Sequence, residues 1–93
     1  MNANYIAGAW LAGADSRRNI NPSDVADVIG EYAYADAAQT GAAIQAAADA
    51  RHTWAHSSPQ VRADALDKIG SELLQRRAEL GELLAREEGK TLV

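Results

Sequence analysis

The 93-residue chain has no cysteine and no phenylalanine, and it has only two histidines. Without a thiol, the segment has no cysteine nucleophile, no disulfide framework and no cysteine-based zinc site. His52 and His56 stand four residues apart near the end of a predicted helix. A metal held by this pair is one interpretation, but no third ligand is indicated, so we favour solvated residues at a helix end.

Large apolar side chains are also scarce. The hydrophobic fraction is 47%, but 21 of these residues are alanine, and leucine, isoleucine and valine together number 17. Burial stabilises by about 25 cal/mol per Å² of apolar area, so an alanine contributes less than a leucine while its backbone costs as much entropy to fix. Chains of this size without disulfides or metals usually depend on partner surface. We therefore expect an ordered piece of something larger.

The chain lacks a basic stripe and a long apolar run. Its net charge is -4, with lysine and arginine scattered along it, so nucleic-acid binding has no electrostatic basis. No apolar run approaches the length of a membrane span, and no secretory signal pattern is present. We expect a cytoplasmic location with no membrane partner.

The first third of the chain has the pattern of strands and loops. Apolar residues on either side of Ala7 and Gly8 predict a hairpin over residues 4–11. Residues 12–18 are polar and contain glycine, which predicts a loop, and residues 19–22 indicate a strand end and a turn. A further strand is predicted from Val28 onward.

Helical periodicity begins near Asp36, which is predicted to cap a helix ending near Trp54, with Gln39 reaching back in a capping box. One face of this helix is predicted to hold Ile44, Ala47, Ala48, Arg51 and Trp54 or Ala55. Ser58 followed by Pro59 predicts the start of a second helix, because proline at the first helical position leaves no additional unpaired N–H.

An apolar stripe follows along the second helix and resumes after Arg76 and Arg77. It comprises Leu66, Ile69 and Leu73, with Leu74 at its edge, and then Leu80, Leu83 and Leu84. The two arginines predict a break near residues 77–78, and Gly89 predicts the end of a third helix. A core face is the favoured use of the stripe, and a helix-pairing seam is the alternative.

Other residue pairs give weaker signals. Glu87 and Glu88 do not share a helical face, so we interpret them as a solvated helix end; the alternative is that one turns inward to hold a cation. Trp10 and Trp54 are interpreted as packing anchors rather than ligand platforms. No glycine-rich dinucleotide fingerprint or Walker loop is present, so the segment shows no phosphate cradle.

Several sequence blocks, in this order and spacing, resemble the opening of the aldehyde dehydrogenase superfamily. Each block is weak alone, but together they cover nearly the whole chain. The blocks are residues 4–10, 19–24, 28–30, 42–47 with Trp54, 59–84 including Arg62, and 87–92. Ala7 departs from the family, which often has asparagine before the turn glycine. The loop of residues 21–27 is longer than the usual form and looks like the subgroup that oxidises α-ketoglutaric semialdehyde.

The resemblance implies an α/β parent enzyme with a Rossmann-type cofactor domain, a catalytic domain and an oligomerisation arm. Residues 1–93 match the N-terminal part of the cofactor domain, with strands and loops over 1–35 and two to three helices over 36–93. The catalytic domain is absent. The partners implied are the remainder of the polypeptide, a small aldehyde substrate, and further copies in a homo-oligomer, either a dimer or a tetramer.

In the family, a cysteine attacks the aldehyde, NAD or NADP accepts hydride, and a glutamate activates water. These functions and the cofactor-binding residues map beyond Val93, so no catalytic or cofactor residue is carried over. Some members hold a sodium or potassium ion with backbone oxygens matching Asn19 or Ile20 and a carboxylate matching Glu87. Oxygen ligands suit such hard cations. The family commonly has aspartate where Glu87 stands, and a further ligand lies downstream.

Two hypotheses follow. The chain is the N-terminal segment of an aldehyde-oxidising enzyme and is inactive alone, or it is an independent helical module that binds a partner or itself through the face of residues 66–84. The strand-rich first third favours the enzyme segment, because a helical adaptor has no use for it.

Overall fold

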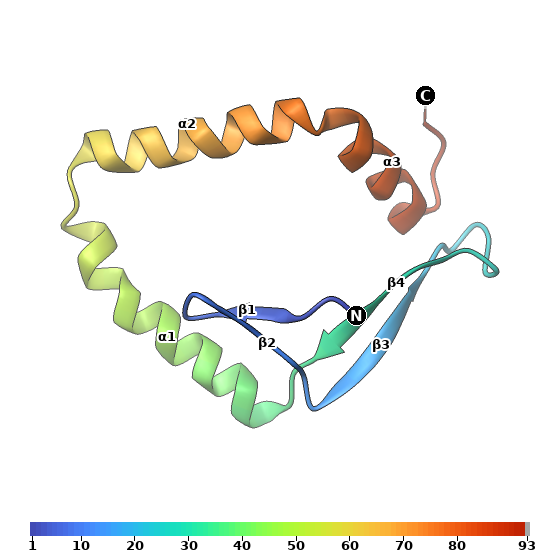
Figure 1. Cartoon of the computed structure of the whole chain (residues 1–93), viewed down its shortest axis with the longest axis horizontal. Coiled ribbons are helices and arrows are strands. Elements are labelled where there is room, and N and C mark those ends of the chain that lie inside the picture. The colour runs from blue at the N-terminus through green and yellow to red at the C-terminus, as the bar shows by residue number, and fades with distance from the viewer. Residues whose placement is uncertain (93) are drawn as a thin grey trace.

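The computed structural model describes residues 1–92, so Val93, the last residue of the predicted helical part, lies outside the described residues. Four strands precede three helices (Figure 1), so the predicted order, with strands first and helices after, is confirmed. The strands are β1 (Asn4–Ile6), β2 (Ala9–Leu11), β3 (Asp15–Ile20) and β4 (Val28–Tyr34). The helices are α1 (Ala37–Ala55), α2 (Pro59–Gln75) and α3 (Arg77–Glu88).

Strands β1 and β2 form the predicted hairpin. They pair antiparallel, with Tyr5 opposite Trp10 and the two ring centroids 4.8 Å apart. Ala7 has φ 52° and Gly8 has φ 83°, so both turn residues are left-handed, as a two-residue turn with the twist of the strands requires. Gly8 adopts this conformation freely, whereas Ala7 does so at a steric cost. The departure noted at Ala7 therefore falls on a strained position.

Strands β3 and β4 form a second antiparallel pair, and part of the predicted loop over residues 12–18 is wrong. The strand begins at Asp15 because its backbone pairs with β4, whatever the polarity of its side chains. The Arg17 guanidinium also lies 4.4 Å from the centre of the Tyr34 ring, so a polar residue gains a partner on this sheet. A bridge from Asn2 to Tyr32 adds a short parallel edge to β4.

Helix α1 begins as predicted, but the predicted capping box is only half formed. The Asp36 side chain accepts a hydrogen bond from the Gln39 backbone N–H at 2.8 Å. The Gln39 side chain does not return to Asp36. It donates to the Ala12 carbonyl and accepts from the Asn4 amide, both at 2.8 Å. The Gln39 side chain therefore bonds to residues distant in sequence instead of completing the capping box, and these bonds link the start of α1 to the hairpin.

The corner between α1 and α2 is fixed from within α2. Ser58 caps α2 by accepting from the Val61 N–H at 3.2 Å, as the Ser-Pro signal predicts. Arg62 reaches back and donates to the carbonyls of Ala55, at 3.4 Å, and Ser57. A cation at the C-terminal end of a helix also complements the helix dipole. Arg62 therefore supplies a partner for carbonyls that α1 leaves unpaired.

The predicted break between α2 and α3 is confirmed, one residue before the expected position. Arg76 lies between the helices with φ -99° and ψ 14°, and its guanidinium contacts both carboxylate oxygens of Glu79 at 2.9 and 2.6 Å. The end of α3 is also confirmed. Gly89 is left-handed with φ 68°, and the Lys90 N–H donates to the Ala85 carbonyl at 3.0 Å.

The elements surround little core. Within residues 1–92, Ala85 is the only buried hydrophobic residue, with 5% of its surface exposed. The accessible surface is 7329 Å², against about 5,200 Å² for a compact protein of this mass. The radius of gyration is 16.8 Å, against about 12 Å for a compact domain. Figure 1 shows why, because the helices follow one another in an open arc rather than stacking. Many large apolar side chains are left exposed, which agrees with the expected dependence on partner surface.

The predicted apolar face of α1 is confirmed only in part, because Ala47 lines the hollow beside the hairpin turn but the large residues of that face do not. Ala43 and Ala46 are half-buried and lie beside the hairpin turn, whereas Ile44 and Trp54 remain exposed. About half of the Trp54 surface, 48%, is exposed. In the part of the chain that the structure describes, no helix is both long and apolar enough to cross a membrane.

Two glycine substitutions test the end of α3. A Cβ added at Gly89 meets the Ser23 hydroxyl at 2.6 Å and Pro22 Cγ at 2.7 Å, and φ is positive there. Gly89→Ala is expected to lower the free energy of unfolding by roughly 1–3 kcal/mol. Gly81→Ala, in the interior of α3 with no atom within 4 Å of the added Cβ, is expected to raise it by up to about 1 kcal/mol.

The measurement is the urea midpoint of each variant, with unfolding monitored by the helical circular dichroism signal. Equal midpoints for the two variants would contradict the assigned role of Gly89.

Candidate functional site

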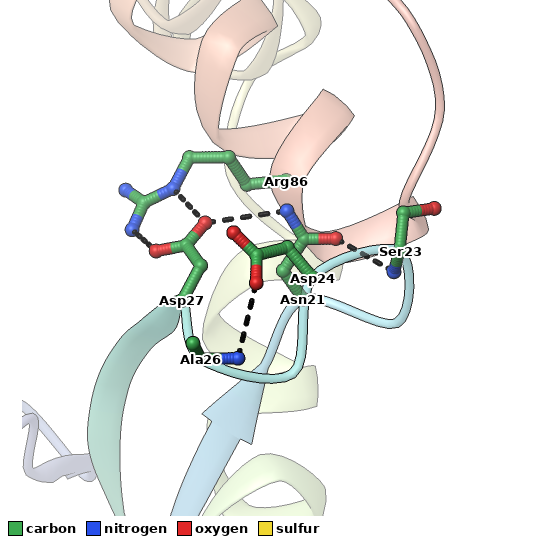
Figure 2. Close-up of polar contacts among 6 residues, drawn as sticks. All are labelled: Asn21, Ser23, Asp24, Ala26, Asp27 and Arg86. Carbon is green, nitrogen blue, oxygen red and sulfur yellow. Dashed lines mark hydrogen bonds and ion pairs between the residues drawn. The ribbon is translucent and has the colours of Figure 1, made fainter.

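A cluster of polar side chains joins the β3–β4 loop to the last turn of α3 (Figure 2). Hydrogen bonds between side chains and backbone N–H groups of the loop itself hold its shape. The Asn21 side chain accepts from the Ser23 N–H at 2.9 Å, and the Asp24 side chain accepts from the Ala26 N–H at 3.1 Å. Asparagine and aspartate commonly close turns in this way. The loop therefore presents Asp27 in a defined position facing α3.

Arg86 of α3 binds Asp27 through two parallel hydrogen bonds. Arg86 Nε lies 2.9 Å from Asp27 Oδ2, and Arg86 Nη2 lies 2.6 Å from Asp27 Oδ1. The Asn21 amide donates to Asp27 Oδ2 at 3.2 Å, so the carboxylate has three donors (Figure 2). This geometry is the strong, bidentate form of an ion pair. We call Asn21, Asp27 and Arg86 the α3 clasp.

The clasp holds its carboxylate in the charged form. The Arg86 hydrogen bonds, and then the Asn21 hydrogen bond, lower the pKa of Asp27 from its ordinary value of 3.8 to about 2. The same contact raises the pKa of Arg86. The pair therefore stays ionised across the physiological range of pH, and it acts as a fixed structural link rather than as a proton donor.

Two further contacts flank the clasp. The Ser23 hydroxyl donates to the Gly89 carbonyl, and the Asn19 side-chain amide donates to Glu87 Oε1 at 2.7 Å. The end of α3 is thus attached both to the loop and to β3. These bonds join residues more than sixty positions apart in sequence.

The residues expected to hold a monovalent cation lie at this junction. Asn19 and Glu87 are in direct contact, and Ile20 ends β3 where the pairing register shifts next to Asn19. Irregular pairing of this kind leaves backbone groups free to turn toward a ligand. The donors are hard oxygens with a single carboxylate, which suits a monovalent ion in chemistry. The structure places these residues close together, and the cation itself stays a prediction.

The other candidate residues have ordinary partners. Glu88 pairs with Lys90 at 2.8 Å, whereas Glu87 is the carboxylate that turns toward the strands. The rings of His52 and His56 stack with centroids 4.0 Å apart, and His56 Nδ1 lies 2.8 Å from the His52 carbonyl oxygen. Over residues 1–92, no group of three or more histidine, cysteine, aspartate or glutamate side chains could hold a metal ion.

Sequence reasoning missed the clasp and the hydrogen bonds of Arg62. The polar run of residues 21–24 signals a turn, and that signal was available. The partner of Asp27, however, stands 59 residues later on a different element. Nothing in one sequence distinguishes Arg86 from the other arginines of the chain.

Comparison with known proteins gives one family. Residues 10–93 match the model described as the aldehyde dehydrogenase family. N-succinylglutamate 5-semialdehyde dehydrogenase of Chromobacterium violaceum is 39% identical over 93 residues, covering 99% of this chain and 19% of that protein. Alpha-ketoglutarate semialdehyde dehydrogenase of Haloferax volcanii is 32% identical over 89 residues, covering 94% of this chain and 18% of that protein.

A third similar protein is 1-pyrroline-5-carboxylate dehydrogenase of Geobacillus thermodenitrificans, 33% identical over 85 residues, which cover 91% of this chain and 16% of that protein. The chain spans about a fifth of the length of the curated relatives it matches. No solved structure gives a significant match.

The clasp predicts a specific dependence of stability on pH. Because the pKa of Asp27 is lower in the folded chain, its contribution to stability is fully present above the ordinary value of 3.8 and is lost as pH falls toward about 2. Asp27→Asn is therefore expected to lower the urea midpoint at neutral pH. The difference from the parent chain is expected to shrink over this acid range.

Asp67→Asn is the matched control, because Asp67 is an exposed carboxylate on α2. Its midpoint difference is expected to be small and to change little with pH. A difference for Asp27→Asn that is as small as that of the control at neutral pH would contradict the role given to the clasp.

Proposed function

The chain belongs to the aldehyde dehydrogenase family, and from this premise we propose that it is the N-terminal segment of an oxidoreductase that converts an aldehyde to a carboxylic acid with NAD or NADP. The observation that carries the proposal is the family match over residues 10–93, together with relatives that are about five times longer. The uncovered apolar surface of the segment supports it, since a larger protein would supply the missing cover.

The proposed role of the segment is to cover the cofactor domain of an α/β, Rossmann-type parent. Strands and loops occupy its first 35 residues, and helices follow. The exposed apolar residues of α1 and α2, among them Ile44, Trp54, Leu66 and Ile69, are the surface proposed to lie against the rest of that polypeptide. The catalytic domain belongs to the part of the parent outside this chain.

The segment itself does not fit a dinucleotide. The helix start that Asp36 caps is occupied by a carboxylate, which repels phosphate, and the start of α2 is closed by Ser58 and Pro59. When bound elsewhere in the parent, NAD or NADP supplies the hydride acceptor. Cysteine is absent here, so the proposed nucleophile also lies outside the chain, and the isolated segment is expected to be inactive.

The proposed substrate is a small semialdehyde. Two of the relatives are named for acting on semialdehydes, and one of these names is α-ketoglutarate semialdehyde. The feature of this chain that supports the proposed substrate is the long β3–β4 loop, which resembles that of the α-ketoglutaric semialdehyde subgroup. Asn21 and Asp24 fold this loop. The loop holds α3 through the clasp.

The monovalent cation remains part of the proposal for the parent. Asn19 and Ile20 would contribute oxygens from the end of β3, and Glu87 would contribute its carboxylate. The parent is further proposed to be a cytoplasmic homo-oligomer, either a dimer or a tetramer. These features depend on surfaces and ligands beyond the segment.

The second candidate function is an independent interaction module. It is favoured by the exposure of Leu66, Ile69 and Leu73 along one face of α2. The hairpin and the β3–β4 pair weigh against it, because they anchor α1 and α3 and add nothing to a helical adaptor.

The proposal is tested in two steps. The DNA downstream of the codon for Val93 is expected to continue in frame into an α/β sequence with a cysteine nucleophile, and the product of that longer frame is expected to reduce NAD or NADP when a semialdehyde is added. The purified 93-residue chain is expected to show no such reduction. An in-frame stop directly after Val93, or aldehyde-dependent reduction by the short chain, would contradict the proposal.

A further inference from the structure

The side chain of Asn19 holds the carboxylate of Glu87 where β3 meets the end of α3. The Asn19 amide donates to Glu87 Oε1 at 2.7 Å. The amide must present its nitrogen here, because a charged carboxylate can only accept hydrogen bonds. Asn19 is half-buried near the end of β3, whereas Glu87 is exposed on α3. A neutral side chain therefore fixes the direction of a charged one.

This hydrogen bond uses one of the two carboxylate oxygens. Within residues 1–92, Oε2 of Glu87 has no hydrogen-bond partner and no ion pair. Because Glu87 is exposed, this oxygen is open to an ion and to further ligands from outside the segment. Ca²⁺ sites often use both oxygens of a carboxylate, together with further carboxylates. Glu87 as held by Asn19 offers one oxygen.

The other charged side chains at the end of α3 balance one another. Asp27 and Arg86 form the bidentate ion pair of the clasp, and Glu88 pairs with Lys90 at 2.8 Å. Among these side chains of the described residues, Glu87 carries the one negative charge without a cationic partner. The number of charged ligands tunes how tightly an oxygen site binds Ca²⁺. A single unbalanced carboxylate therefore suits a monovalent ion better than a divalent one.

We infer that the Asn19 side chain determines which class of cation the proposed site takes. Aspartate has the shape of asparagine, so an acid at this position would place a second carboxylate beside Glu87. The neutral amide instead keeps the site at one negative charge, which favours Na⁺ or K⁺ over Ca²⁺. This inference rests on the cation proposed for the parent, and it adds the residue that sets the specificity of that site.

Asn19→Asp tests the inference in the product of the longer reading frame, where the ligand set is proposed to be complete. Without a divalent ion, the two neighbouring carboxylates repel each other, so the melting temperature is expected to fall. Added Ca²⁺ is expected to restore it, because an ion that binds the folded state stabilises that state. Calorimetric titration is expected to show Ca²⁺ binding at least about tenfold tighter than in the unmodified product.

Two further variants separate the position of the charge from its presence. Asn4→Asp adds the same charge on β1, where Asn4 contacts Gln39 rather than α3, and is expected to bind Ca²⁺ no more tightly than the unmodified product. Asn19→Asp combined with Glu87→Gln returns the site to a single carboxylate. The gain in Ca²⁺ affinity is therefore expected to disappear in this double variant.

Circular dichroism keeps the test decisive if Asn19→Asp does not fold without a divalent ion. Recovery of the helical signal on addition of Ca²⁺, but not of Na⁺ at the same ionic strength, would support the inference. An Asn19→Asp variant that stays unfolded in Ca²⁺ would overturn it.

The response of the unmodified product to Na⁺ and K⁺ distinguishes failure of the inference from failure of the proposed cation. If neither ion raises the melting temperature relative to choline chloride at the same concentration, the proposed cation is wrong and the inference is lost with it. If one of them does, the inference alone is overturned by an Asn19→Asp variant that gains no Ca²⁺ affinity, or by a double variant that keeps the gain. None of these measurements depends on aldehyde oxidation.

Discussion

The ion pair between Asp27 and Arg86 is the contact on which the placement of α3 depends. Among residues 1–92 a single small residue is fully buried, so hydrophobic burial contributes little to where the helices lie. Directional polar contacts hold them instead, at the clasp, at the Gln39 side chain and at the Arg62 guanidinium. Each ties a helix end to an element distant in sequence or to a neighbouring helix. The arrangement is therefore specified by hydrogen-bond geometry to a degree unusual in a globular domain.

Local signals in the sequence were sufficient for most elements. Asp36 and Ser58 mark helix starts because their side chains accept from nearby backbone N–H groups, and Gly89 ends α3 because it adopts positive φ without a Cβ. The start of strand β3 was not predicted, because Asp15 joins the sheet only by pairing with the backbone of β4. Asn19 and Glu87 were named as candidates on the strength of a resemblance rather than of any pattern in the residues, and the structure joins them by a hydrogen bond, while the cation stays a prediction.

The apolar face of α1 shows that local sequence patterns do not identify long-range neighbours. Periodicity placed Ile44 and Trp54 on a common face, and that placement is sound geometry, but periodicity cannot say which neighbour a face will meet. Within this chain the hairpin lies beside Ala43 and Ala46 instead. A helix rich in alanine offers close approach on several sides, so its large residues are available to a surface that the chain does not contain.

The fixed corner between α1 and α2 has a consequence for how the segment meets that surface. Because Arg62 links α2 to the end of α1 from inside the segment, the orientation of the two helices is restricted before any docking. A two-helix panel that arrives already bent loses less conformational freedom on contact than two loosely hinged helices would. Its apolar side chains can then engage together rather than one helix at a time.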